Sequence, residues 1–218
     1  QLKVYESYLA KARLLVHEGT GARMNLLAAL TRLRQICVSP SLVLEGEYSS
    51  AKVEYLLEAL TGLKQSGRKA IVFSSFVSAL ELIGKACKNA GINPEYITGD
   101  TSAKVRVILA DRFNKPDSNI DVMLVSLKAG GTGLNLIGAD TVFHLDPWWN
   151  LAAERQAEDR AYRIGQTNKV TVFKLVLKNT VEETLLDLQK KKGILIDMAD
   201  EASVEGALTE EDYRFLLS

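Results

Sequence analysis

From Lys69 onward, short apolar segments alternate with amphipathic ones, and this alternation constrains the fold more than any other feature of the sequence. Continuous apolar runs such as IVF and VMLV suit strands in a sheet that is covered on both faces. Strand–helix alternation at this spacing implies crossover connections and a mostly parallel sheet. We predict an α/β fold with helices on both faces of that sheet. The predicted strands are Lys69–Phe73, Pro94–Thr98, Asp121–Ser126, Thr141–Leu145 and Val170–Val176, and the predicted helices are Ala79–Asn89, Ala103–Phe113, Leu151–Ile164 and Val181–Lys191.

The residues before this α/β part have a helical pattern. Apolar residues recur at helical spacing in two runs, which are separated by a loop signal at Gly19-Thr20-Gly21. The second run ends before Ser39-Pro40, because proline disfavours the helical conformation of the residue before it. A linker follows, and then an amphipathic helix over Lys52–Leu63. We therefore predict three parts: a helical segment and linker over 1–48, the α/β part over 49–192, and a tail over 193–218.

Composition excludes several classes of function. Hydrophobic residues make up 47% of the chain, which is enough to bury a core. Lys plus Arg number 27 and Asp plus Glu number 27, so any contact with nucleic acid must be local. No apolar run approaches the ~20 residues that span a bilayer, and no signal peptide is present. We expect an intracellular protein without a membrane segment, and the first residue, Gln1, indicates a piece of a longer chain.

The two cysteines, Cys37 and Cys87, lie far apart and form no CxxC pair. Without clustered histidines they cannot complete a zinc site, so we expect no metal site and two small buried side chains.

A glycine-rich turn follows the predicted strand Asp121–Ser126, in the sequence LKAGGTGLN. Glycines allow a ligand to approach the backbone closely, and consecutive amides in such a turn can bind an anion. It is not a phosphate-binding Walker loop, because GxxxxGK[ST] occurs nowhere in the chain. A structural tight turn explains these glycines equally well.

The predicted helix Leu151–Ile164 carries Gln156, Arg160 and Arg163 at a spacing that places them on one face. The small residues Ala153, Ala157 and Ala161 have the same spacing and favour close packing on the sheet. Two guanidiniums beside a closely packed helix suit an anionic ligand. The alternative is a solvated face on which Asp159 pairs with Arg155 and Arg163.

The stretch QAEDRAYRIGQ, from Gln156 to Gln166, resembles the QAxDRAxRIGQ signature of Swi/Snf-family DNA translocases. The preceding DPWWN is similar to the DPxWN element of that family, and the glycine turn resembles its AGGxGxNL loop. IVFSSF, Gly99-Asp100-Thr101 and the upstream LRQIC match further elements in order. The resemblance covers nearly the whole chain and weakens only after Gly193.

This resemblance implies a motor with two RecA-like lobes, ATP between them and double-stranded DNA across both. The phosphate-binding lysine loop and the acidic box that binds Mg²⁺ belong to the first lobe, so this chain is the second lobe and is inactive alone. The first lobe and double-stranded DNA are its expected partners, and ATP with Mg²⁺ is its expected cofactor. The implied catalytic residues are Arg163, the better candidate for the γ-phosphate, and Arg160. The implied nucleotide-site residues are Gln156, Gly131, Gly133 and Asn135.

The resemblance further suggests DNA-backbone contacts at Ser75, Thr101, Lys128 and Trp148. We expect the chain to be a monomer. The ending Leu208–Tyr213 resembles prokaryotic members, which favours the cytoplasm or nucleoid; a eukaryotic member would lie in the nucleus.

This sequence departs from the family pattern at two positions, where Tyr162 replaces a common histidine and Leu151 a common proline. Neither change removes a group that would contact phosphate. His144 follows an apolar run and is predicted to be structural. A Rossmann-type enzyme would need GxGxxG after its first strand, where this chain has Ser74-Ser75-Phe76. A lobe retained only as an interaction module is a further alternative, which the paired arginines disfavour.

Overall fold

The computed structural model describes residues 1–15, 23–130, 134–148, 151–162, 169–192 and 208–218. These residues group into two compact units. The helical unit comprises Gln1–Lys52, Asp146–Ala152 and Val176–Ser218, and the sheet unit comprises Val53–Leu145 and Ala153–Leu175. The division into 1–48, 49–192 and 193–218 stays a prediction. None of the described helices combines the length and the apolar character needed to cross a membrane.

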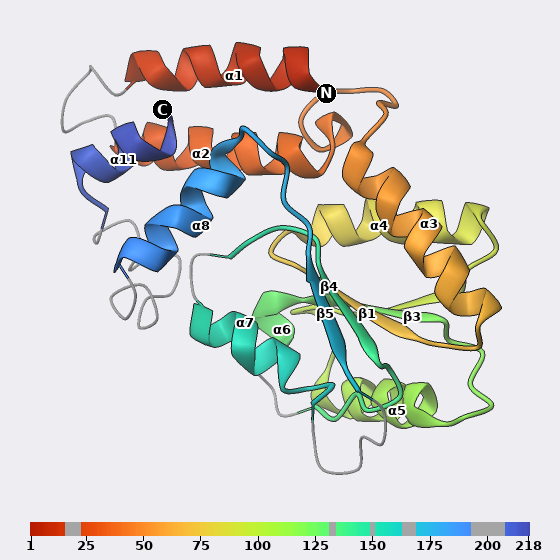
Figure 1. The fold of residues 1–218 in the computed structure, drawn as a ribbon. Coiled ribbons are helices and arrows are strands. Elements are labelled where there is room, and N and C mark those ends of the chain that lie inside the picture. Colours follow the sequence, from red (N-terminus) through yellow and green to blue (C-terminus); the bar gives the residue numbers. More distant parts are fainter. Residues whose placement is uncertain (16–22, 131–133, 149–150, 163–168, 193–207) are drawn as a thin grey trace. The chain divides into compact units, whose positions relative to one another are not determined.

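The sheet unit is built on five parallel strands in the order β2-β3-β1-β4-β5 (Figure 1). They are β1 (Ala70–Ser74), β2 (Pro94–Ile97), β3 (Val122–Ser126), β4 (Thr141–His144) and β5 (Thr171–Lys174). All five predicted strands are thereby confirmed, with ends that differ by one or two residues. The register pairs Ala70 with Val122 on one side and with Thr141 on the other.

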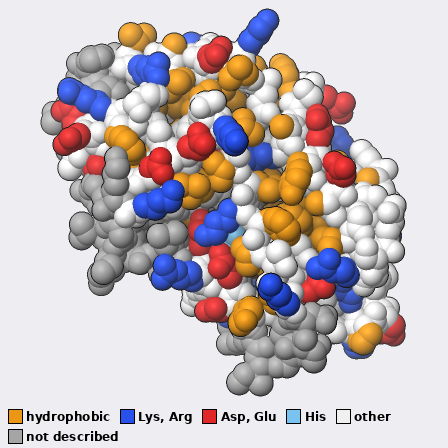
Figure 2. Space-filling view, viewed as in Figure 1, with side chains coloured by type: hydrophobic (Ala, Val, Ile, Leu, Met, Phe, Trp, Pro, Cys, Tyr) orange, Lys and Arg blue, Asp and Glu red, His pale blue; other side chains and the backbone are white. Residues whose placement is uncertain are grey.

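The three central strands are fully buried, and β5 is an exposed edge. Every residue of β1, β3 and β4 is buried, whereas all four residues of β5 are exposed. Figure 2 shows hydrophobic side chains gathered over α3 (Ala51–Gln65) and β5, where Tyr55 and Phe173 are 48% and 39% exposed. The mixed sequence TVFK of β5 is that expected of an edge strand.

Helices cover both faces of the sheet, as the apolar strands predict. In Figure 1, α3 and α4 (Val77–Asn89) lie on one side of the sheet and α5 (Ala103–Asn114) lies on the other. The hydroxyl of Ser102 caps the start of α5 by accepting from the amide of Val105. The short α6 (Leu127–Gly130) follows β3 directly.

Helix α7 spans Leu151–Glu158, so it ends before Ile164, where the sequence predicts its end. The chain continues from Asp159 in turns, and the amides of Ala161 and Tyr162 both donate to the carbonyl of Glu158. The expectation of one continuous helix that carries all the arginines is therefore wrong for the described residues.

The helical unit contains α1 (Leu2–Leu15), α2 (Arg23–Val38), the 3₁₀ turn η3 (Pro40–Leu42), α8 (Val181–Lys192) and α11 (Glu210–Leu216). The predicted apolar stripe of α2, at Leu26, Leu30, Leu33 and Cys37, is buried. Thr209 and Asp212 form a capping box that starts α11, within the predicted tail. Both cysteines are buried, as predicted, and burial raises the pKa of the Cys87 thiol to about 11.

The chain after the glycine turn packs against the end of α5 at Gly138. A Cβ atom at this position would lie 2.6 Å from the carbonyl oxygen of Phe113 and 2.9 Å from Cα of Asn114. The amide of Gly138 donates to Oδ1 of Asn114 over 2.9 Å, which fixes this close approach. Only glycine fits here without a backbone shift.

Gly138→Ala is therefore expected to lower the free energy of unfolding by about 1–3 kcal/mol, the usual cost of overpacking. Gly62→Ala is the matched control, because this exposed position in α3 has no atom within 4 Å of the new methyl group. There the loss of backbone freedom in the unfolded chain and the higher helix propensity predict a gain of about 0.5–1 kcal/mol. Urea unfolding followed by circular dichroism measures both. A Gly138 variant as stable as the parent would contradict the close packing.

Candidate functional site

The predicted DNA-contact residues of the sheet unit follow three neighbouring strands. Ser75 follows β1, Thr101 lies in the loop after β2, and Lys128 lies in α6 just after β3. Because the strands are parallel, their carboxyl ends meet at one edge of the sheet, where ligands of such folds bind. The structure thus brings the three positions to a common edge. Ser75 and Thr101 are half-buried, and the side chain of Lys128 lies outside the described part.

Arg106 of α5 organises this edge. Its guanidinium donates to the carbonyls of Thr98 at 2.9 Å, Gly99 at 3.2 Å and Thr101 at 2.7 Å. A further, longer bond of 3.4 Å reaches the carbonyl of Ala129 in α6. The side chain is 9% exposed, so it is a buried cation whose charge is spread over main-chain carbonyls. Arg106 therefore ties the loop after β2 to the helix after β3.

Sequence reasoning assigns Arg106 no role in the site. Its signal is the position within a helix that follows a loop of small polar residues, Gly99 to Ser102. A long buried cation near such a loop is suited to bind carbonyls that the tight turn leaves unpaired. The pattern alone could not show that the same guanidinium also reaches Ala129.

The glycine turn itself, with Gly131 and Gly133, lies outside the described residues, but the chain that leaves it is anchored. The carbonyl of Asn135 accepts a hydrogen bond from Nδ2 of Asn114 over 2.9 Å. Oδ1 of Asn135 is buried, and nothing among the described residues donates to it. Such an amide is held in place by its backbone while its own polar group remains free to bind a ligand.

Arg160 is joined to the same segment. Its carbonyl accepts a hydrogen bond of 2.9 Å from the amide of Leu136, the residue after Asn135. The structure therefore brings two predicted nucleotide-site residues, Asn135 and Arg160, together across the sheet unit. The Arg160 side chain is only 5% exposed. Gln156 is exposed, so it differs in burial from Arg160 although helical spacing predicts one face for both, and Arg163 lies outside the described residues.

Two acidic residues hold α7 against the sheet. Oε2 of the fully buried Glu154 side chain pairs with Nζ of Lys174 in β5 over 2.6 Å. Oε1 of Glu158 lies 3.2 Å from Nε2 of His144 and 3.6 Å from Nζ of Lys174. His144 is fully buried and stacks on Phe73, with ring centroids 5.5 Å apart. These surroundings agree with the predicted structural role of His144.

The contact with His144, supported by the charge of Lys174, holds the pKa of Glu158 below its ordinary value against the opposing effect of burial. Ala157 and Ala161 are buried, as expected of small residues that allow close packing. The alternative of a solvated helix face loses part of its support, because no ion pair joins Arg155 and Asp159, which are both described and exposed. The end of α7 is fastened to the sheet unit.

The fourth predicted DNA-contact residue, Trp148, belongs to the helical unit. Its side chain is 9% exposed, and its carbonyl accepts a hydrogen bond from Nε2 of Gln189 in α8. Little of the indole surface is therefore free in this chain to contact DNA.

Among the described residues, no group of three or more His, Cys, Asp or Glu side chains is placed to hold a metal ion. At the strand ends, the Arg106 guanidinium donates to main-chain carbonyls, and the unpaired Oδ1 of Asn135 is a hydrogen-bond acceptor.

The five-stranded parallel sheet with helices on both faces is a RecA-like fold, and the stretch Gln156–Gln166, here called the arginine motif, follows its fourth strand in the sequence. Residues 51–165 match the family model of the helicase conserved C-terminal domain. The chain belongs to this family, and its relatives and structural neighbours include SWI2/SNF2-type proteins.

Relatives come from eukaryotes and bacteria. The chain is 42% identical over 175 residues to the ATP-dependent helicase rhp16 of Schizosaccharomyces pombe, which covers 78% of this chain and 20% of that protein. It is 36% identical over 179 residues to the putative ATP-dependent helicase/translocase YwqA of Bacillus subtilis, with coverage of 79% and 19%. The chain thus spans about a fifth of the length of these relatives.

Solved structures agree with the fold. The SWI2/SNF2 ATPase C-terminal domain of Sulfolobus solfataricus has a TM-score of 0.77 at 25% identity, covering 100% of this chain and 93% of that one. The ATPase core of the same organism in complex with double-stranded DNA has a TM-score of 0.79 at 29% identity, covering 98% of this chain and 46% of that one.

The lowered pKa of Glu158 predicts a pH-dependent stability. A carboxylate whose pKa is lower in the folded than in the unfolded state stabilises the folded state at pH values above its unfolded pKa, here the ordinary 4.5. This stabilisation is lost as the pH falls through the pKa of the folded state. Glu158→Gln should therefore unfold at lower denaturant concentration than the parent at pH 7, and the difference should shrink below pH 4.5. The exposed Glu211→Gln variant is the control and should track the parent at every pH. A Glu158→Gln deficit that persists unchanged in acid would contradict the role of the charge.

Proposed function

We propose that this chain is the second lobe of an ATP-dependent double-stranded DNA translocase, supplying arginines to the nucleotide and part of the DNA track. The observation that carries the proposal is the hydrogen bond between Leu136 and Arg160, which joins the segment leaving the glycine turn to the arginine motif. A motor needs such a link, because events at the nucleotide must reach the surface that holds DNA. The relatives named as ATP-dependent helicases support the same reading.

At the nucleotide, we assign Arg163 as the arginine that contacts the γ-phosphate. Phosphoryl transfer places developing negative charge on the phosphate oxygens, and a planar guanidinium can neutralise it with two parallel hydrogen bonds. Arg160 is nearly covered in this chain, which suits a supporting cation whose charge acts from behind the surface. Gln156, Asn135 and the glycines at 131 and 133 would complete the contacts. Mg²⁺ would be held mainly by the first lobe, so the isolated chain would not hydrolyse ATP.

At the DNA, the strand-end loops after β1, β2 and β3 would contact the phosphate backbone through Ser75, Thr101 and Lys128. Lys and Arg side chains are interspersed with Asp and Glu on the face in Figure 2, and the formal net charge is zero. Such a surface can neutralise only a few phosphates. The solved relative with double-stranded DNA supports this partner for the lobe, whereas Trp148, being buried, is the weakest of the proposed contacts.

The arginine assignment predicts a steep loss of activity in the full-length protein. Arg163→Ala should lower DNA-stimulated ATP turnover by about 10³-fold or more, since arginine fingers are typically worth that much. ATP affinity should fall much less, because the first lobe would hold most of the nucleotide. Arg163→Lys should rescue poorly, because one ammonium cannot reproduce a planar pair of donors. Steady-state ATP hydrolysis with saturating DNA, together with nucleotide binding, measures both effects.

Arg155 is the control for this experiment, because it lies on α7 but is exposed and forms no ion pair with a described residue. Its alanine variant should keep its turnover. If Arg155→Ala and Arg163→Ala have equal and mild effects, the arginine motif is a solvated surface and the proposed function loses its catalytic part.

The isolated chain should bind double-stranded DNA weakly and without sequence preference. The fitted slope of log affinity against log salt concentration should correspond to about two to four released counterions, since each contacted phosphate contributes about 0.9. The same preparation should show no ATP hydrolysis with or without DNA. Fluorescence anisotropy with labelled duplexes at several salt concentrations measures the slope. Tight binding that ignores salt, or DNA-dependent ATP turnover by the chain alone, would overturn the proposal.

A further inference from the structure

Helix α5 contacts the loops of the sheet unit through polar side chains at both of its ends. Arg106, in its first turn, donates to carbonyls of the loop after β2 and to the carbonyl of Ala129 in α6. Asn114, its last residue, bonds to residues 135–138, which lead toward β4. All of these groups belong to the sheet unit. One helix therefore holds the main chain at three places that are separate in the sequence.

The side-chain amide of Asn114 makes two bonds of opposite polarity. Its Nδ2 atom donates to the carbonyl of Asn135, and its Oδ1 atom accepts from the amide of Gly138, each over 2.9 Å. A side-chain amide carries its donor and its acceptor in a fixed geometry, so the two bonds together fix both ends of residues 135–138. The missing Cβ atom of Gly138 allows this close approach to the end of α5.

Residues 135–138 also contact the arginine motif. Between the two residues bonded to Asn114 lies Leu136, whose amide donates to the carbonyl of Arg160 over 2.9 Å. The main chain of this segment is thus bonded both to α5 and to Arg160. Oδ1 of Asn135 is buried and has no donor among the described residues, so the backbone bonds decide where this oxygen lies.

Arg106 has the corresponding role at the start of α5. A guanidinium presents five donors in one plane, whereas an ammonium presents three donors from one point. Arg106 uses this breadth to reach carbonyls of Thr98, Gly99 and Thr101 in one loop and of Ala129 in another element. Since the side chain is only 9% exposed, few other acceptors could replace these carbonyls if either loop moved.

We propose that Arg106 and Asn114 are positioning residues, through which α5 sets where Thr101 and Asn135 lie. The structural part of this inference stands on the hydrogen bonds of the two side chains alone. Its effect on activity rests on the proposed function, in which Thr101 contacts DNA and Asn135 contacts the nucleotide. Because each side chain holds a different loop, their loss should affect different steps: Arg106 should govern the use of DNA, and Asn114 should govern turnover.

The structural part is tested in the 218-residue chain by amide hydrogen exchange, followed residue by residue with NMR. Asn114→Ala removes the acceptor of the Gly138 amide, which should then exchange about 10-fold faster, the expected effect of one lost hydrogen bond. Asn114→Asp keeps an acceptor oxygen and should keep this protection. The matched control is Asn89→Ala, because Asn89 is likewise the last residue of its helix, α4, but is exposed. Unchanged protection of Gly138 in the folded Asn114→Ala variant, or equal acceleration in the control, overturns the proposal.

The effect on activity is tested in the full-length protein by ATP hydrolysis at increasing DNA concentration. Arg106→Lys keeps the charge, so it remains informative where an uncharged variant would not fold, but one ammonium cannot hold both loops. It should raise the DNA concentration for half-maximal stimulation about 10-fold, as expected for the loss of one bond to a charged phosphate, and change kcat by less than about threefold. Arg112→Lys is the control on the same helix, because Arg112 is exposed, and should change neither quantity.

Asn114→Ala should show the opposite pattern in the same assay. A shift of about 1 Å in a group that contacts the reacting nucleotide costs up to about 10²-fold in rate. We therefore expect kcat at saturating DNA to fall about 10- to 100-fold, while the DNA concentration for half-maximal stimulation changes by less than about threefold. A role in stability alone predicts no such separation, so parallel changes in both quantities for Arg106→Lys and Asn114→Ala would contradict the positioning role.

Failure of this inference can be told apart from failure of the proposed function. If Arg163→Ala abolishes turnover while Arg106→Lys and Asn114→Ala behave like their controls, the positioning role is wrong and the proposed function stands. If Arg163→Ala itself has no effect, the proposed function fails, and the exchange of the Gly138 amide still decides whether Asn114 fixes residues 135–138.

Discussion

A parallel sheet whose central strands are buried on both faces leaves only its strand ends available for function, and the rest of this lobe is arranged around that constraint. β1, β3 and β4 contribute every side chain to the interior. The residues that can meet a ligand are therefore those just beyond each strand. Arg106 makes these separate loops act together, because one guanidinium bonds to carbonyls after both β2 and β3. A buried cation shared by two loops resists the displacement of either one alone.

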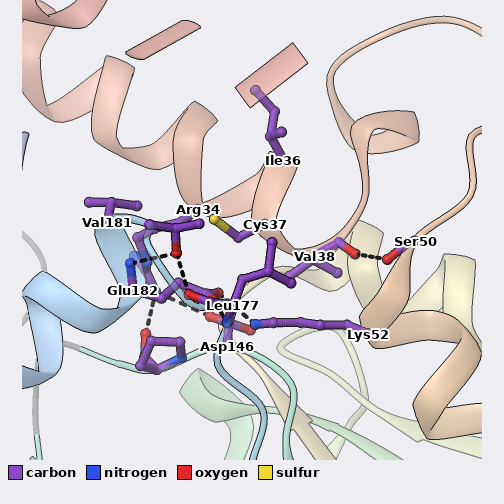
Figure 3. Close-up of polar contacts among 12 residues, drawn as sticks. Arg34, Ile36, Cys37, Val38, Ser50, Lys52, Asp146, Leu177, Val181 and Glu182 are labelled. Carbon is purple, nitrogen blue, oxygen red and sulfur yellow. Dashed lines mark hydrogen bonds and ion pairs between the residues drawn. The ribbon is translucent and has the colours of Figure 1, made fainter. Parts of the chain in front are cut away.

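A buried cation that bonds to separate parts of the chain is also present in the helical unit. Apolar residues of α2 supply its core, and Arg34 adds little to stability by being there. What Arg34 provides is specificity, since few other acceptors would satisfy the bonds that it makes to Asp146 and to the carbonyl of Pro147 (Figure 3). Within the sheet unit, Glu154 and Glu158 of α7 contact Lys174 and His144 of the sheet.

The sequence predicts the sheet well because buried parallel strands are continuous apolar runs, and such runs have little alternative. All five strands follow from this pattern. The end of α7 is predicted wrongly, because the spacing of Ala157, Ala161 and Ile164 continues a helical pattern that the chain leaves at Glu158. The roles of Arg34 and Arg106 escape the sequence for a different reason. Both donate to main-chain carbonyls, which every residue has, and the carbonyls of Pro147 and Ala129 lie far along the chain from Arg34 and Arg106.

Arg160 shows how structure refines a motif. Helical spacing treats Gln156, Arg160 and Arg163 as equivalent members of one face, but a guanidinium that is 5% exposed and a side chain that is exposed cannot do the same work. A buried cation acts at a distance through a low-dielectric interior, where charge is poorly screened, while contact with a phosphate requires an accessible donor. The backbone bond from Leu136 to Arg160 then has a reason beyond folding. Under the proposed function, this bond would keep the buried charge at a fixed distance from the segment that leaves the glycine turn.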